Sequence, residues 1–157
     1  MMSGKDMISE FKTDISEFWT VSHSQLYPEL QRMVDEKQIK VAEDVEVKDR
    51  KVINYVIEAK GQETLKRWLA EPITLKNDEL TSLKLYCISD QRAPILQQIL
   101  KQCLALHQQK VVHLKARKEL LFGDELAIKA NYGHYLILSR AIERESDYVN
   151  WLQSKIN

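Results

Sequence analysis

The spacing of apolar residues changes at residue 40 and changes back near residue 58. On both sides of this stretch they recur every three or four positions, which is typical of amphipathic helices. Within it, residues 41–47 and 52–58 alternate β-branched with polar residues, and the charged link Lys48–Lys51 joins them. This pattern predicts two strands of a hairpin whose tip lies in solvent. The first half of the chain should therefore contain two helices, a hairpin and a third helix.

The first helix is predicted over residues 3–19, where Ser3 and Asp6 could form a capping box. The second runs from about Ser24 to Glu36 and has a narrow apolar face. The residues of that face are Leu26, Leu30 and Met33, and the opposite face carries Gln25, Pro28, Gln31 and Arg32. The third helix is expected to end at Pro72. Its predicted buried residues are Leu65, Trp68 and Leu69.

The second half reads as helical throughout. Asn77 or Asp78 can cap a short helix, and Pro94 suits the first turn of a long helix that Gly123 stops. A last helix is expected over about residues 125–156. No third element of comparable length remains to cover these two helices, so their apolar stripes predict a homodimer. The stripe residues expected between protomers are Leu96, Ile99, Cys103, Val111, Leu114, Ile142, Val149 and Leu152.

Composition narrows the function classes. The 157 residues carry no net charge, so charge alone does not point to nucleic acid, although a local basic patch remains compatible with it. Cys87 and Cys103 form no disulfide framework, and no apolar run is long enough to cross a bilayer. Both observations favour a cytoplasmic protein.

Motifs for catalysis and cofactors are missing from the sequence, which has no phosphate-binding glycine loop and no metalloprotease motif. Cys103 and His107 stand four apart and could offer two metal ligands, but no second pair follows, so no metal site is predicted. Glu143 and Glu145 have no recognisable acid–base partner in sequence, and His113 reads as an ordinary helix residue. We therefore expect neither an enzyme nor a cofactor.

Two helices, a hairpin and a following helix describe a winged helix, in which the second helix enters the DNA major groove. Its N-terminal residues would approach phosphates, Tyr27 would give its hydroxyl to a phosphate, and glutamines could bond adenine edges. The predicted DNA-binding residues are Ser22, His23, Ser24, Gln25, Tyr27 and Gln31 on the helix and Lys48, Arg50 and Lys51 on the wing. The alternative is a protein-docking winged helix with a solvated charged turn.

Specific runs of residues carry a resemblance. Residues 3–11, residues 18–33 with their FW and SHSQLYPEL runs, and residues 49–72 resemble the PadR family of bacterial transcriptional regulators, including its AphA-like members. Residues 133–152, GHYLILSRAIERESDYVNWL, resemble the helical dimerisation domain of that family. The resemblance implies a mostly α-helical fold, with a winged-helix domain over residues 1–72 and a dimerisation domain over residues 76–157. It also implies a homodimer that represses or activates transcription at operator DNA.

Some members of that family are released from DNA by small phenolic acids that lodge where the two domains meet. Here Tyr132, His134 and Tyr135 stand at the start of the last helix and could provide an aromatic slot with hydrogen-bond donors. They are therefore candidate effector-binding residues. The alternative is that these rings only pack the helix against its neighbours.

The sequence departs from the family pattern at several places. The apolar helix that usually precedes the segment at Ser3 is expected to be missing, which leaves a rival assignment as a protein-binding adaptor or a ligand sensor. Lys5 replaces the usual aromatic residue after glycine, and Glu58 replaces a threonine after the wing strand. Lys37 replaces the glycine common after the second helix. The last two changes are expected to alter local caps and leave the fold intact.

Overall fold

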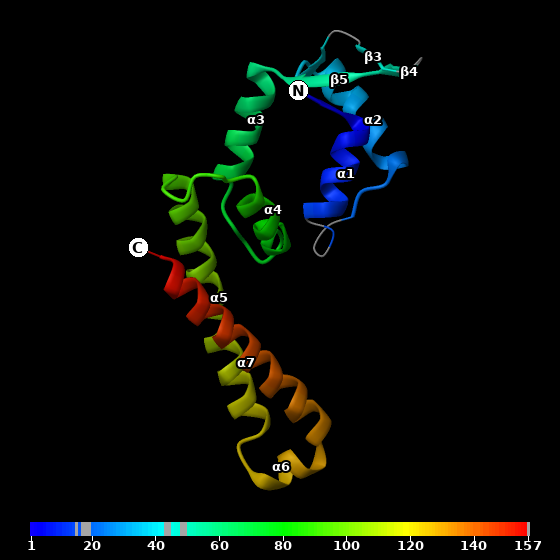
Figure 1. Cartoon of the computed structure of the whole chain (residues 1–157). Coiled ribbons are helices and arrows are strands. Elements are labelled where there is room, and N and C mark those ends of the chain that lie inside the picture. Colours follow the sequence, from blue (N-terminus) through cyan, green and yellow to red (C-terminus); the bar gives the residue numbers. More distant parts are fainter. Residues whose placement is uncertain (15, 17–19, 43–44, 48–49, 157) are drawn as a thin grey trace. The chain divides into compact units, whose positions relative to one another are not determined.

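The computed structural model describes residues 1–14, 16, 20–42, 45–47 and 50–156, and of residues 45–47, 50 and 51 it describes the backbone alone. The chain forms two compact units, Met1–Leu69 and Ala70–Asn157 (Figure 1).

The first unit has the winged-helix arrangement of helices and strands. Its helices are α1 (Gly4–Asp14), α2 (His23–Asp35) and α3 (Ala59–Ala70), and its strands are β1 (Met2–Ser3), β2 (Ile39–Val41), β3 (Val45–Val47), β4 (Arg50–Val52) and β5 (Asn54–Ile57). β1, β5 and β2 form an antiparallel sheet in that order, and β3 pairs with β4 as a separate antiparallel hairpin. The predicted order of two helices, hairpin and helix is confirmed. The short strand β1 was not predicted.

The predicted capping box at the start of α1 is confirmed. The hydroxyl of Ser3 donates to Oδ2 of Asp6 at 2.6 Å, and the backbone N–H of Asp6 donates to that hydroxyl oxygen at 3.2 Å. The backbone N–H of Ser3 also donates to Oδ2 of Asp6, at 3.3 Å, and the two bonds that Ser3 donates to the Asp6 carboxyl lower its pKa. α1 ends at Asp14, and the apolar residues Ile15, Phe18 and Trp19, which were predicted on the same helix, lie outside the described residues.

Two residues set the path of the chain from α2 into the sheet and from the sheet into α3. Lys37 has a φ of 57°, the left-handed conformation in which glycine is favoured. Gly61 is buried, and a Cβ there would lie 2.2 Å from the carbonyl oxygen of Gln38, the residue before β2. Leu65, one turn later on α3, is 38% exposed, so its predicted burial is wrong. Trp68 and Leu69 are half-buried.

The second unit is built on a long helical hairpin. A 3₁₀ turn, η1 (Asp78–Leu80), leads into α4 (Thr81–Tyr86), and α5 (Pro94–Leu121) then runs beside α7 (Tyr132–Lys155), with the short α6 (Glu125–Ala130) at the turn between them (Figure 1). The predicted single last helix is wrong, since Asn131 has φ −137° and ψ 45° and divides it. In the described part of the chain, none of the helices is long and apolar enough to cross a membrane.

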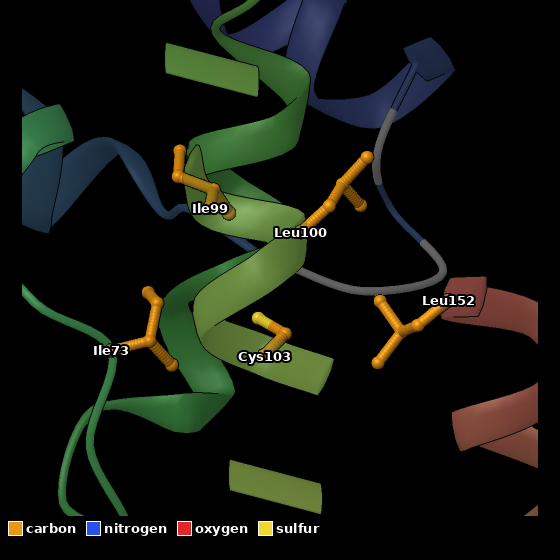
Figure 2. Close-up of a cluster of buried hydrophobic side chains, with 5 residues drawn as sticks. All are labelled: Ile73, Ile99, Leu100, Cys103 and Leu152. Atoms are coloured by element: carbon orange, nitrogen blue, oxygen red, sulfur yellow. The ribbon is translucent and has the colours of Figure 1, made fainter. Parts of the chain in front are cut away.

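The core of the second unit lies where the segment before α4 meets α5 and the end of α7 (Figure 2). Its buried residues are Ile73, Ile99, Leu100, Cys103 and Leu152. Ile99, Cys103 and Leu152 were predicted to be buried largely between protomers, and this is wrong because each is at most 1% exposed within one chain. The short elements between residues 73 and 88 cover this part of the hairpin, although they looked too small to do so.

Candidate nucleic-acid interface

The N-terminus of α2 presents an exposed row of small polar side chains. Ser22 is the N-cap residue, and its backbone N–H and hydroxyl donate to Oε1 of Gln25 at 3.2 and 2.9 Å. The hydroxyls of Ser22 and Ser24 lie 2.9 Å apart. The first N–H groups of a helix have no partner within the helix, so this end has a partial positive charge that suits an anion. In this structure the side-chain oxygen of Gln25 accepts both bonds from Ser22 and so completes the capping box.

Tyr27 is held in place by the first helix. Gly4 is buried, and a Cβ at that position would lie 3.0 Å from the Tyr27 ring. The ring of His23 stacks with that of Tyr27, with centroids 6.2 Å apart. Burial raises the pKa of Tyr55 on β5, and the neighbouring phenol of Tyr27 adds to the rise. Tyr27 remains 46% exposed, so it packs with one face and presents the other to solvent.

The two predicted faces of α2 are present. Leu30 is buried and Leu26 and Met33 are half-buried, while the residues predicted opposite, Gln25, Pro28, Gln31 and Arg32, are exposed. Acidic residues are distributed unevenly along the exposed face of α2. The described acids of α2 and its cap are Glu29 at the middle of the helix and Asp35 and Glu36 at its C-terminal end.

These acids accept hydrogen bonds from the exposed polar side chains in the second half of α2. Arg32 donates to Glu29 and to Glu36 at 2.7 Å each, and these hydrogen bonds raise the pKa of the guanidinium. Gln31 donates to Oδ1 of Asp35 at 2.9 Å. An approaching phosphate would therefore be favoured at the N-terminal end of α2 and disfavoured at its C-terminal end.

The basic residues of the wing are only partly described. Lys48 lies outside the described residues, and Arg50 and Lys51 are described by their backbone in β4, where they pair with Val47 and Glu46 of β3. The predicted link Lys48–Lys51 is therefore shorter than expected, because β4 already begins at Arg50.

The predicted effector residues lie in the second unit, at the start of α7. The ring of Phe122 is buried, and His134 and Tyr135 meet it edge-on with centroids 5.3 and 5.6 Å away. Tyr132 stacks on Tyr135 at 6.0 Å, and Nζ of Lys118 lies 4.5 Å from the Tyr135 centroid. The rings therefore form one aromatic cluster with a cation beside it. Their packing around Phe122 also fits the alternative of a purely structural role.

A buried ionic cluster in the second unit was not predicted. His107 is 4% exposed, and its ring nitrogens lie 2.5 Å from Oε2 of Glu145 and 3.0 Å from Oδ1 of Asp78. Lys110 donates to the other oxygen of Asp78 at 2.6 Å, and the ring of Tyr148 meets His107 edge-on at 4.5 Å. Both ring nitrogens of His107 therefore face a carboxylate oxygen, and Lys110 adds a cation beside Asp78.

The surroundings of this cluster shift two pKa values. Burial alone would raise the pKa of Asp78, but the hydrogen bonds from Lys110 and His107 outweigh it, and that pKa is lowered. Burial, together with the nearby Cys103 and the two carboxylates, raises the pKa of Tyr148 to about 12. Sequence spacing pointed to Cys103 and His107 as a pair, but Sγ of Cys103 lies 3.6 Å from Oγ1 of Thr81.

Both halves of the chain match described families. Residues 1–67 match the family described as transcriptional regulator PadR-like, and residues 77–157 match the family described as virulence activator alpha, C-terminal. The chain is 34% identical to the negative transcriptional regulator PadR of Bacillus subtilis (strain 168), over 98% of this chain and 87% of the relative.

Two solved structures of Bacillus subtilis PadR are similar to this chain. A crystal structure in complex with operator DNA has 31% identity and a TM-score of 0.44. A crystal structure in complex with p-coumaric acid has 32% identity and a TM-score of 0.42. Each match covers 98% of this chain and 87% of the other.

Proposed function

The chain belongs to the PadR-like family of transcriptional regulators, and we propose that it represses transcription as a homodimer bound to operator DNA. The observation that carries the proposal is the 34% identity to a negative transcriptional regulator over nearly the whole chain. A relative crystallised with operator DNA supports the choice of ligand. Membership in a family of regulators agrees with the expectation that the chain is not an enzyme. A regulator of bacterial promoters would act in the cytoplasm.

The N-terminal half of α2 is the proposed contact with DNA. A phosphate would approach the N–H groups after Ser22, and the hydroxyl of Tyr27, held by Gly4, would donate to the same strand. Gln31 and Gln25 would read adenine edges, and Gln25 would first have to leave the cap that it closes in this structure. Alanine at Gln25 should then change sequence preference by about 1–3 kcal/mol.

The wing would add positive charge that strengthens binding to all DNA sequences alike. Lys48, Arg50 and Lys51 are proposed to touch backbone phosphate on either side of the groove that holds α2. The acids in the second half of α2 favour this division of roles, because they keep phosphates away from that end of the helix.

A homodimer would place two copies of α2 on a two-fold operator. Exposed apolar side chains on the long helices are the proposed contacts, since the core residues of the hairpin are already buried within one chain. These are Val112 and Leu120 on α5 and Leu136 and Ile137 on α7, with exposures from 48% to 76%. A stable dimer of this kind should bury more than about 2,000 Å². Sedimentation at micromolar concentration checks it, and a stable monomer would contradict it.

A small aromatic acid is the proposed effector, supported by the relative crystallised with p-coumaric acid. The candidate residues are His134 and Tyr135, whose rings meet Phe122, and Tyr132, which stacks on Tyr135 beside Lys118. The effector must bind the DNA-free form better, because equal affinity for both forms shifts nothing. Calorimetry with p-coumaric acid tests the site, with His134→Ala as the variant. No heat, or heat unchanged by the substitution, would leave these rings as packing residues.

A gel-shift experiment against genomic fragments tests the proposed function as a whole. The chain should select a fragment with two-fold symmetry, and its affinity should fall steeply with salt because bound phosphates release counterions. Absence of selection at low salt would favour the protein-binding adaptor instead.

A further inference from the structure

A cavity of about 570 Å³ lies within the second unit, between the middle of α5 and the middle of α7. Its apolar walls come from Leu106 and Leu114 on α5, Ala141 on α7 and Leu75 from the segment before η1. The first three are half-buried and Leu75 is exposed at the rim. The volume falls within the range of about 300–1,000 Å³ that small-molecule sites occupy. This cavity is separate from the aromatic cluster at the start of α7, since it shares no lining residue with it.

Cations outnumber acids in the polar lining of the cavity. Lys110 and Arg144 stand against one acid, Glu145, and Gln109 and His113 complete that lining. Glu145 is already engaged by His107 at 2.5 Å, whereas Arg144 lies 3.6 Å from the same carboxylate and its side chain is 70% exposed. Lys110 gives one hydrogen bond to Asp78, and an ammonium has three donors. The cavity thus combines an aliphatic surface with two cations, Lys110 and Arg144. Their N–H donors outnumber the hydrogen bonds that the neighbouring carboxylate of Glu145 can accept.

We propose that this cavity binds a monocarboxylate with an aliphatic body, such as a medium-chain fatty acid. The aliphatic chain would lie along Leu106, Leu114 and Ala141, and the carboxylate would accept hydrogen bonds from Arg144 and Lys110. Charge-assisted bonds to a carboxylate are the strong kind, and a bidentate bond to a guanidinium fixes orientation. An aliphatic body fits better than an aromatic one because every apolar side chain that lines the cavity is aliphatic. The inference concerns the second unit alone and does not depend on DNA binding.

Calorimetry of the full chain with sodium octanoate, in the absence of DNA, tests the proposal. Octanoate should bind with one site per chain, and 1-octanol, which has the same body without the charge, should bind more weakly. Arg144→Gln should weaken octanoate by roughly tenfold, the equivalent of about 1.4 kcal/mol. Ala141→Phe should abolish binding because the ring fills the cavity.

Arg140→Gln is the matched control. Arg140 is also on α7, is 72% exposed, and lies 3.7 Å from Glu143, but it does not line the cavity. Its replacement should leave octanoate binding unchanged. The proposal is overturned if octanoate gives no heat, if both arginine variants lose affinity equally, or if octanol binds as well as octanoate. It is also overturned if octanoate dissociates a dimer in sedimentation, since the cavity would then belong to the interface between copies.

Discussion

Replacing His107 by leucine should destabilise the second unit strongly. The side chains of His107, Glu145 and Asp78 are 6%, 12% and 22% exposed, so removal of the ring takes a hydrogen-bond partner from each of two carboxylates with little access to water, while Lys110 still donates to Asp78. Leaving a buried, charged acceptor without its hydrogen-bond partner costs about 1–3 kcal/mol or more, and the loss at two carboxylates places this case near 3. For a chain of this length, that loss lowers Tm by roughly 6–12 °C.

Thermal unfolding followed by circular dichroism at pH 7 measures this loss. The control is Lys129→Ala, which breaks an ion pair whose side chains are 73% and 86% exposed and should cost less than about 1 kcal/mol. Adding Glu145→Met to His107→Leu removes the carboxylate that has lost its buried partner and should recover much of the lost stability. A change below 1 kcal/mol for His107→Leu, or no recovery in the double variant, would refute the reasoning.

Four further outcomes follow from single residues. Lys37→Gly should raise the free energy of unfolding by about 0.5–1 kcal/mol in urea titrations, because it removes left-handed strain. Gly61→Ala should lower it by more than about 2 kcal/mol, since its Cβ would meet the carbonyl oxygen of Gln38. Because the pKa of Tyr148 is raised in the folded state, the stability that its neutral phenol contributes is complete below about pH 10. This stability is lost as the pH rises through about 12, so Tyr148→Phe should reduce the fall of Tm at alkaline pH. Lys51→Ala should weaken binding to all DNA sequences alike and reduce the salt slope by about one, as measured by fluorescence anisotropy.

Local patterns in the sequence were enough to predict most of the elements. The alternation after residue 40, the buried stripe of α2, the Ser3 capping box and Pro94 at the start of α5 each depend on neighbours a few residues apart. The family resemblance depended on such local runs as well. The replacement of the family's usual glycine by Lys37 was also visible in the sequence. The backbone at this position is left-handed, which is the conformation that glycine adopts most easily.

Contacts distant in sequence could not be predicted in this way. His107 meets Glu145 across 38 residues and Asp78 across 29, and the residues next to each of the three do not indicate these partners. The wrong prediction that apolar residues of the long helices lie between protomers has the same origin. Ile73 covers Ile99 and Cys103, but nothing in its local pattern says where the segment that carries it will fold.

The central claim is that operator DNA binds at the N-terminus of α2, and the substitution Ser24→Glu tests it most directly. A carboxylate in the first turn of a helix stabilises the helix by about 0.3–1 kcal/mol, so Tm should stay equal or rise. The same charge repels a phosphate, and operator affinity measured by anisotropy should fall by roughly tenfold or more. Gln98→Glu, an equal change at an exposed position near the start of α5, should leave affinity unchanged. Operator binding by Ser24→Glu as tight as that of the unmodified chain would contradict the account.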